Sequence, residues 1–446
     1  MSGGLARRIA VDVTPIRVSR DFRHLELGGV VSALGSQAAL VALPFEIFRV
    51  SHSATLVGLL GAFELGPMTV ISLVGGAFLD RHDRRPILIG AQGLLVAVLL
   101  GLAALVLASG RPPVLALLLL GGLLAGASSL SQVAAAAIAP ALLGPELLTS
   151  GMAFSFGAYQ AASVVGPGLG GLLIGATGVG GVFLIDAASC LALVWAGLVI
   201  PAQPPVGGVG TPAYGAGDGD RVKGSPGAAP VPVRRAISEG LGFVARTRAL
   251  AGSFVVDLNA MTFGMPRALF AVLALTVFHA GAGGTGLLYA AIAVGGTLSV
   301  LTSGWVAHAR RLGRIVLWCV ALWGLAIVGV GLVGSLAAAA GLLALAGWAD
   351  GISAICRTTI AQSLTPEPMR GRMSAVYSLV VAGGPRLGDI ESGLVAGLSG
   401  ALASVWIGGA ACVLGVGAVM VAYPELTAYD AEAVRARGED APRPPR

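Results

Sequence analysis

The sequence predicts an all-α membrane protein with about twelve transmembrane helices in two six-helix bundles. The chain has 446 residues and a mean hydropathy of +0.87, and only 11% of its residues are charged, whereas a soluble domain carries roughly 25%. Its apolar residues gather in runs of about 20, the length that spans a bilayer. Six runs precede a polar stretch and six follow it, so a membrane bundle fits better than a large soluble core.

The twelve runs define the predicted spans. Their bounds are 24–48, 54–78, 86–109, 113–138, 149–175, 179–200, 250–279, 284–307, 313–334, 337–362, 373–398 and 401–423. The predicted domains are a tail (1–23), a first bundle (24–200), a linker rich in Pro and Gly (201–249), a second bundle (250–423) and a second tail (424–446). The pattern of 234–250 also predicts a short amphipathic helix at the membrane surface.

The placement of positive charge predicts the orientation of the chain. Of the 28 Lys and Arg residues, 23 fall in the two tails, the linker and alternate loops, all on one side of the predicted membrane. The positive-inside rule then places both termini in the cytoplasm. The net charge of +6 therefore reflects topology, and we expect the lipid bilayer as a partner and no nucleic acid.

Composition and motifs disfavour several other classes. The four cysteines, at Cys190, Cys319, Cys356 and Cys412, lie inside apolar runs without metal-ligand spacing, so we interpret them as buried small residues and expect no metal site. No GxxxxGKS or GxxxxGKT motif occurs, which disfavours ATP-driven pumping by this chain alone, and no cofactor is expected. No catalytic constellation is visible at helical spacing, so the chain is not expected to be an enzyme. A passive channel would not need a six-plus-six arrangement.

Short motifs repeat between the two halves. GGAFLDRHDRR at 75–85 follows the second run, and SGWVAHARRLGR at 303–314 follows the eighth. PELLTSGM at 145–152 and PEPMRGRM at 366–373 precede the fifth and eleventh runs at a similar offset. Two six-helix halves related by parallel repetition are typical of transporters that work by alternating access.

These motifs resemble signatures of the major facilitator superfamily. Gly76, Asp80, Arg81, Arg84 and Arg85 resemble the signature between its second and third helices. Asp83 departs from that signature, because it stands where a glycine is common. GPGLGG at 166–171 resembles the Gly-Pro signature of exporters in the superfamily. The resemblance implies the major facilitator fold and favours export.

A closer similarity, to the enterobactin exporter branch, covers nearly the whole chain. It is carried by VALPFEIF (41–48), LYAAIAVGGTLSVLTSGWVAHARR (288–311) and LTPEPMRGRM (364–373). This similarity implies export of a catecholate siderophore from the cytoplasm across the bacterial inner membrane. Because no ATP-binding motif is present, we expect the proton gradient to drive export in exchange for protons, and we expect a monomer. Broad drug efflux is the alternative, although the aromatic content of only 6% argues mildly against a multidrug cavity.

The inner-loop signature suggests a conformational latch made by Gly76, Asp80, Arg81 and Arg84. A carboxylate at the end of a span can bind a neighbouring helix start or an arginine in the outward-facing state only. Leaving that state then requires breaking the contact, which costs free energy. The alternative is that the arginines only fix topology, which we favour for Arg84 and Arg85.

The Gly-Pro signature suggests a backbone role for Gly166, Pro167, Gly170 and Gly171. Proline removes an N–H group and kinks a helix, while glycines permit close approach of a neighbour. We expect that neighbour to be a helix of the other half, in a contact that seals or hinges the extracellular side. Ordinary tight packing is the alternative.

Ionisable side chains within spans are functional candidates by default. Arg267, Asp350 and Arg357 are predicted to bind substrate; Arg267 also matches an arginine position of the enterobactin exporter branch. Arg267 needs a partner, which an anionic ligand or Asp350 would supply. Asp350 and Arg357 lie two turns apart, about 10 Å along a helix axis, and are expected to be too distant to pair directly. A buried structural pair is the alternative.

Three acids are candidates for proton coupling, namely Glu64, Asp350 and Asp389. Glu64 lies near the middle of its run, where ionisation is costly; an interhelical hydrogen bond is the alternative. Asp389 matches a position of the enterobactin exporter branch, and a structural pair with Arg386 at i and i+3 is the alternative. Two further acids, Glu46 and Asp186, are expected to be solvated at the outer ends of their spans.

Overall fold

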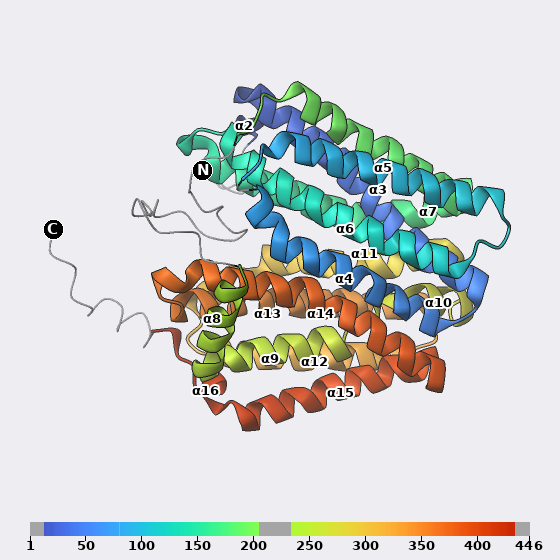
Figure 1. Cartoon of the computed structure of the whole chain (residues 1–446). Helices are drawn as coiled ribbons and strands as arrows, with labels where there is room; N and C mark the ends of the chain where they lie inside the picture. Colours follow the sequence, from blue (N-terminus) through green and yellow to red (C-terminus); the bar gives the residue numbers. More distant parts are fainter. Residues whose placement is uncertain (1–12, 80, 205–232, 433–446) are drawn as a thin grey trace, which may run out of the picture. The chain divides into compact units, whose positions relative to one another are not determined.

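The computed structural model describes residues 13–79, 81–204 and 233–432 (Figure 1). Every regular element in these ranges is helical, and ten of the helices are long and apolar enough to cross a membrane. One of the ten covers two predicted runs, and the eleventh predicted run, which is the most charged, lies on a further long helix outside that set. Eleven of the predicted runs fall on a helix and the seventh falls on an interrupted one, so the predicted all-α membrane class is confirmed.

The chain divides into two compact units. Unit 1 comprises Met1–Val50 and Phe63–Val231, and unit 2 comprises Ser51–Ala62 and Pro232–Arg446. One boundary falls before the last residue of α3 (Arg20–Ser51), and the other passes through α4 (Ala54–Leu79), whose first residues belong to unit 2.

In unit 1, long helices pack around an apolar core. Besides its share of α4, the unit contains α2 (Thr14–Val18), α3 (Arg20–Ser51), α5 (Arg84–Ala108), α6 (Val114–Ile138), η1 (Ala139–Leu142) and α7 (Pro145–Val199). Helix α5 packs against both α6 and α7. A buried cluster that includes Phe22, Leu88, Ile138 and Ile200 joins these helices near the end where α5 begins.

In the structure, one non-helical residue divides the helix that covers the fifth and sixth predicted spans. Helix α7 is continuous by hydrogen bonding from Pro145 to Val199, but Gly178 has φ +72° and ψ 174°, outside the helical region. A residue with a side chain rarely adopts this conformation, whereas glycine does so at little cost. The chain therefore turns at Gly178 with almost no loop, at the boundary predicted from hydropathy.

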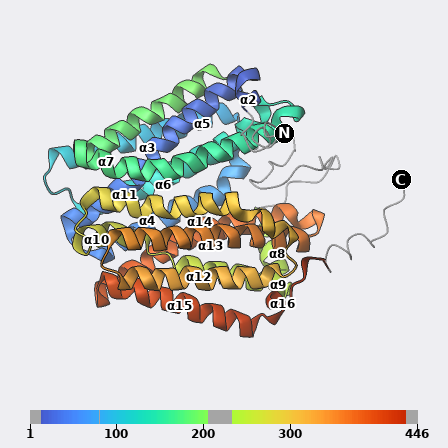
Figure 2. The ribbon, with the colours of Figure 1, turned by 180° about the vertical axis from the view of Figure 1, so that it is seen from behind.

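Unit 2 contains the helices from Val233 to Thr427. The elements are α8 (Val233–Arg246), α9 (Arg248–Phe263), η2 (Arg267–Leu269), α10 (Phe270–Thr276), α11 (Gly281–Thr302), η3 (Ser303–His308), α12 (Leu312–Leu332), α13 (Leu336–Leu364), η4 (Glu367–Met369), α14 (Arg370–Ser399), α15 (Ala401–Ala422) and α16 (Pro424–Thr427). Figure 2 shows α11, α13, α12 and α15 in that order across the unit, and each neighbouring pair is in contact. Helix α8 is amphipathic, as predicted for 234–250.

The seventh predicted span, 250–279, falls on the candidate span Arg248–Thr276, but its helical path is interrupted. Helix α9 ends at Phe263, and the helical path resumes only at η2 and α10. Pro266 has no backbone N–H to continue the hydrogen-bond ladder, so the backbone groups next to it need other partners. The indole of Trp323 on α12 supplies one by donating to the Gly264 carbonyl at 2.6 Å.

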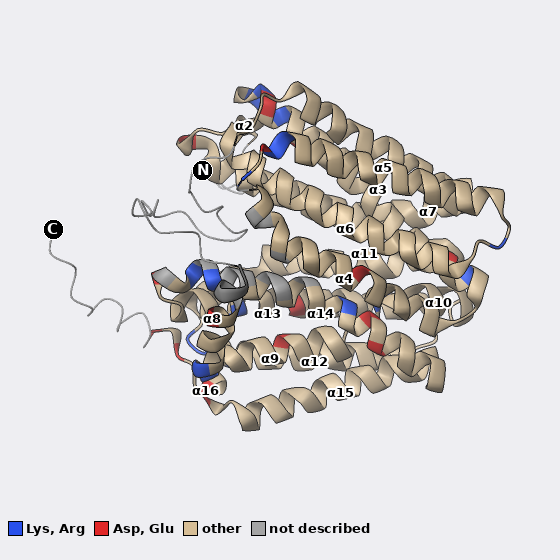
Figure 3. Ribbon diagram, in the orientation of Figure 1, with Lys and Arg blue, Asp and Glu red and all other residues tan. Residues whose placement is uncertain are grey.

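Charged side chains are sparse along the helices of each unit and gather mostly at helix ends (Figure 3). A few acidic and basic residues nevertheless lie well inside long helices. Because a charge within a membrane span is expensive, such residues mark the places where function is to be sought. Two groups of them lie in unit 2, and both involve residues singled out from the sequence.

Candidate functional site

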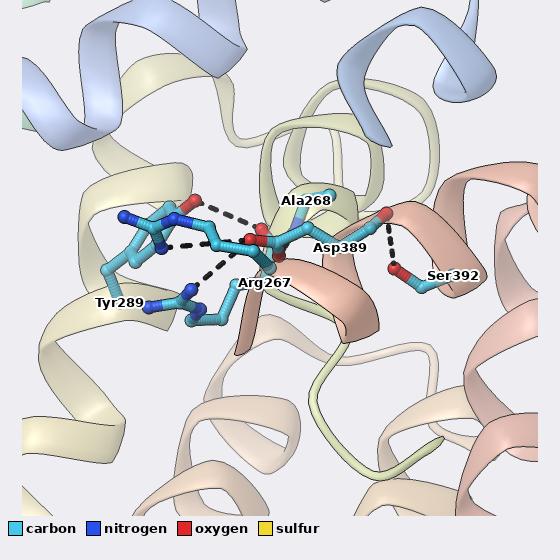
Figure 4. A network of polar contacts seen from close by, with 6 residues as sticks. Arg267, Ala268, Tyr289, Asp389 and Ser392 are labelled. Atoms are coloured by element: carbon cyan, nitrogen blue, oxygen red, sulfur yellow. Dashed lines mark hydrogen bonds and ion pairs between the residues drawn. The ribbon is translucent and has the colours of Figure 1, made fainter. Parts of the chain in front are cut away.

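Asp389 of α14 binds the break between α9 and α10. Its Oδ2 lies 3.2 Å from Arg267 Nη2, and its Oδ1 accepts the backbone N–H of Ala268 at 3.1 Å (Figure 4). Arg386, one turn earlier on α14, places Nη1 3.9 Å from the same Oδ2. Tyr289 of α11 donates its hydroxyl to the Arg267 carbonyl at 3.0 Å. One carboxylate thus joins two arginines and an interrupted backbone.

This network changes the pairing expected from the sequence. Arg267 contacts Asp389, and the expected contact with Asp350 is not among its described ion pairs. Asp389 pairs more closely with Arg267 than with Arg386, its i−3 neighbour. The side chains of Arg267 and Asp389 are only 18% and 12% exposed, so each depends on the other for much of its charge compensation.

The start of α4 presses against α14 beside Asp389. A Cβ atom added to Gly58 would lie 2.5 Å from the Asp389 carbonyl oxygen and 2.6 Å from Gly393 Cα. A Cβ added to Gly61 would lie 2.8 Å from the Arg386 oxygen and 2.9 Å from Asp389 Cβ. Glycine on both helices therefore permits a backbone contact that no larger residue would allow without movement, and this contact fixes the part of α14 that carries Asp389.

Arg357 of α13 is the centre of the second group. Its Nη1 lies 2.8 Å from Asp257 Oδ1 on α9, and its Nη2 lies 3.5 Å from Asp350 Oδ1. Nη1 also donates to Ser353 Oγ at 3.2 Å. The expectation that Asp350 and Arg357 are too far apart to pair is wrong, because the long arginine side chain spans two helical turns and brings its guanidinium back to Asp350.

The three charged side chains of this group differ in access to their surroundings. The side chains of Arg357 and Asp257 are 6% and 5% exposed, whereas that of Asp350 is 31% exposed. Two carboxylates share one guanidinium, so if one carboxylate binds a proton, Arg357 still pairs with the other. Asp350 is the member best placed to receive it.

Asp257 is the functional candidate to which sequence reasoning gave no role. It is an in-span acid, but nothing within one helical turn marks it as more than a buried polar residue. Its partner Arg357 lies 100 positions later, so only the packing of α9 against α13 brings them together.

Glu26 is a further in-span acid that was not among the predicted ones. It lies within the first predicted run, on α3, and accepts the Ser155 hydroxyl at 2.5 Å.

The arginines that follow α4 bind carbonyl groups at helix ends. Arg84 is buried and donates Nη1 to the Ala137 carbonyl of α6 at 3.0 Å. Arg85 donates Nε to the Gly197 carbonyl and Nη2 to the Leu198 carbonyl, at 2.8 and 2.7 Å. Carbonyls in the last turn of a helix lack backbone partners, and basic side chains there are stabilising. Both arginines thus have a structural role beyond topology.

The predicted latch is not tested by these contacts. Asp80 lies outside the described residues, Gly76 lies within α4, and Arg81 is exposed. Asp83, where the superfamily signature favours glycine, caps α5: its carboxylate accepts the N–H groups of Arg85 and Gln203 at 2.9 and 3.0 Å. The departure from the signature therefore has a local structural reason, and the latch role of the other residues stays a prediction.

The glycines of the Gly-Pro signature face a helix of their own unit. A Cβ on Gly170 would lie 2.7 Å from the Ala38 carbonyl oxygen of α3, and a Cβ on Gly166 would meet Gln37 of the same helix. The expectation that these glycines accommodate a helix of the other half is therefore wrong for Gly166 and Gly170. Helix α7 continues through Pro167, and Gly171 is buried, while the sealing role stays a prediction.

Two acids expected to be solvated are buried. Glu46 is completely buried, and Arg49 holds it with Nη2 2.6 Å from Oε1 and Nε 2.8 Å from Oε2. Asp186 is 1% exposed and accepts the hydroxyls of Ser36 and Ser189 at 3.4 and 3.0 Å. Both predictions failed because distance from a span end does not say which face of the helix a residue occupies.

Glu64 lies in the middle of α4 and is partly buried, and its role as a proton carrier stays a prediction. Within the described ranges, no three His, Cys, Asp or Glu residues are grouped closely enough to hold a metal ion. Arginine–carboxylate ion pairs are the main polar contacts of the two groups in unit 2.

Comparison with known families decides the class of the protein. The family model described as Major Facilitator Superfamily matches residues 25–388. The chain belongs to the Major Facilitator Superfamily. The family resemblance inferred from the sequence is thereby confirmed, and the chain is a multi-pass membrane transporter by family.

Named relatives align with this Major Facilitator Superfamily member along most of its length. The Enterobactin exporter EntS of Citrobacter koseri is 30% identical over 411 residues, which cover 90% of this chain and 89% of that protein. The Enterobactin exporter EntS of Salmonella typhi is 29% identical over 406 residues, 90% of each chain.

Solved structures share the fold at lower identity. A bacterial homologue of the iron transporter ferroportin in an inward-facing state gives a TM-score of 0.66 at 18% identity, covering 92% of this chain and 98% of that one. The nucleoside transporter NupG gives 0.64 at 13% identity, covering 92% and 98%. At these identities the likeness concerns the fold alone, which is that of the superfamily.

Proposed function

We propose that this transporter exports a siderophore of the catecholate class from the cytoplasm by alternating access, in exchange for protons. It acts in the bacterial inner membrane with both termini in the cytoplasm. The observation that carries the choice of substrate is the similarity, along 90% of the chain, to proteins named Enterobactin exporter.

Arg267 is the proposed contact for the anionic oxygens of the substrate. A guanidinium offers several N–H donors in a planar fork that suits oxygen anions. In the described state Arg267 uses Nη2 on Asp389. A ligand oxygen that competes for Arg267 would release Asp389, which retains its contacts to Ala268 and Arg386. When substrate binds, Arg267 exchanges Asp389 for a substrate oxygen, and neither buried charge is left without a partner.

Asp350 is the proposed proton-exchanging acid. It shares Arg357 with Asp257, but its contact is longer and its side chain is more exposed. When Asp350 takes up a proton, Arg357 keeps Asp257 as its counterion, so the buried guanidinium is not left unpaired. Arg357 then serves to hold the two acids and to present one of them. Glu64 and Asp389 remain candidates for a second proton.

Transport into inside-out vesicles tests the proposal. The vesicles contain the full-length protein and are given a labelled catecholate siderophore, first with an imposed proton gradient and then after that gradient is collapsed. We expect accumulation that requires both the protein and the gradient. An Arg267→Lys variant tests the role of Arg267. It keeps the positive charge but removes the planar guanidinium, and it should lower siderophore uptake by about tenfold.

The outcomes separate the substrate from the mechanism. Accumulation that survives collapse of the gradient would retain siderophore export but remove proton coupling. An absence of siderophore uptake in vesicles that still accumulate an unrelated cationic dye would overturn the siderophore proposal and indicate drug efflux.

A further inference from the structure

A groove in unit 2 lies apart from both charged groups described above. It encloses about 620 Å³ between α8, η4 and the first turn of α14. The lining residues are Ser238, Glu239, Gly242, Phe243, Arg246, Met369 and Arg372. None of them takes part in the proposed transport steps, so the groove calls for a separate explanation.

Positive charge is in excess among the groove side chains. Arg372 lies 2.9 Å from Glu239, and these two side chains are 32% and 30% exposed. Arg246 is exposed and makes no ion pair with the described residues. Two guanidinium groups therefore accompany one carboxylate, on two different elements. Guanidinium groups match the oxygens of a phosphate group in both charge and geometry, so the groove suits a phosphate-bearing anion.

The walls of the groove are fixed by close packing. A Cβ atom added to Gly240 of α8 would lie 2.8 Å from Val376 Cγ2 and 2.9 Å from the Arg372 carbonyl oxygen. Behind this contact, Val244 belongs to a buried cluster that also contains Met373 and Val376. Helix α8 is thereby seated on α14, and the spacing between Arg246 and Arg372 does not depend on a loose loop.

The groove also has an apolar side. Phe243 and Met369 line it next to the two arginines, and Leu241 of α8 is 48% exposed. Helix α8 is amphipathic, and only Thr247 separates it from α9, which begins the candidate membrane span Arg248–Thr276. An amphipathic helix at the end of a span lies at the level of lipid headgroups, and basic pockets there bind anionic headgroups.

We propose that this groove binds the phosphate headgroup of an anionic membrane lipid. Arg246 and Arg372 contact the phosphate, Glu239 orients Arg372, and Phe243 and Met369 contact the lipid chains. A soluble phosphate would use the same arginines but would gain nothing from the apolar side, and the test separates these two sources.

Native mass spectrometry of the full-length protein tests the proposal. The protein is released from detergent after titration with phosphatidylglycerol or phosphatidylcholine, and the fraction of protein that retains lipid is measured. We expect preferential retention of phosphatidylglycerol, reduced about fivefold in an Arg246→Gln variant, since one arginine near the headgroups contributes about 1 kcal/mol. The control is Arg111→Gln, which removes an exposed arginine outside the groove and should leave retention unchanged.

Two further arms keep the test decisive. Glu239→Gln removes the carboxylate but keeps both arginines, so retention of phosphatidylglycerol should be maintained or increased. Equal retention by Arg246→Gln and the unmodified protein would overturn the proposal. Displacement of the lipid by millimolar inorganic phosphate, dependent on Arg246, would also overturn it and assign the groove to a soluble phosphate.

Discussion

Arg267 and Asp389 lie 122 positions apart in the chain, yet their side chains meet at 3.2 Å where the helical path is interrupted. The same carboxylate accepts the N–H of Ala268, so a single acid serves both the charge of the arginine and the backbone of the break. Loss of either partner is therefore expected to affect stability and transport together.

Removing Asp389 alone should lower the free energy of unfolding more than removing Asp389 and Arg267 together. Asp389→Ala leaves Arg267 without its closest described acid, and we expect the free energy of unfolding in detergent to fall by about 3 kcal/mol. The double variant with Arg267→Ala should recover a large part of that loss. A double-mutant cycle on thermal unfolding measures the coupling, and strictly additive effects would show that the pair is not coupled in solution.

The two acids that share Arg357 should behave differently. Asp350→Asn is expected to abolish the dependence of transport on the proton gradient while leaving the melting temperature nearly unchanged, since Asp257 still pairs with Arg357. Asp257→Asn should instead lower the melting temperature, because it removes the shorter and more buried contact. Transport under an imposed pH gradient, with and without that gradient, provides the comparison; gradient-dependent transport by Asp350→Asn would move the coupling site elsewhere.

The contact between α4 and α14 should tolerate no side chain at Gly58. In Gly58→Ala the new methyl group would meet the Asp389 carbonyl oxygen and Gly393, and overpacking of this kind costs about 1–3 kcal/mol. Gly66→Ala on the same helix is the control, because a Cβ there has no neighbour within 4 Å and alanine favours the helix. Melting temperatures of the two variants should therefore shift in opposite directions, and equal shifts would argue against the close contact.

The indole of Trp323 should stabilise the break between α9 and α10. Trp323→Phe removes the donor that binds the Gly264 carbonyl at 2.6 Å, and a buried carbonyl without a donor costs about 1–3 kcal/mol. Trp318→Phe is the matched control, since that tryptophan is 76% exposed on the same helix. Thermal unfolding of both variants measures the difference, and equal stability would mean that water or another group replaces the indole.

The sequence predicts the spans well because span length and hydropathy are local properties. Even the turn between the fifth and sixth spans falls where predicted, next to Gly178. The break in 250–279 was missed although Pro266 is visible in the sequence, because prolines are often tolerated within membrane helices. Whether the helix breaks near Pro266 depends on whether other helices supply partners for the freed backbone groups, as Trp323 and Asp389 do.

The residues of the candidate site were predicted from the sequence, but their ion-pair partners were not. Arg267, Asp389, Asp350 and Arg357 all stood out as charges within apolar runs, which is a local signal. Their partners depend on which helices are neighbours, so the Arg267–Asp389 and Arg357–Asp257 contacts could not be derived from spacing. The same limitation explains the burial of Asp186, for which Gly35 on α3 leaves room.

The turn at Gly178 also constrains how the protein is made. With one non-helical residue between the two arms of α7, the nascent chain has no slack with which to leave one arm in water while the other spans the bilayer. Exposing either apolar arm outside the membrane would be costly. We therefore expect the two arms to enter the bilayer together as a helical hairpin, with 145–199 as one unit of insertion during synthesis.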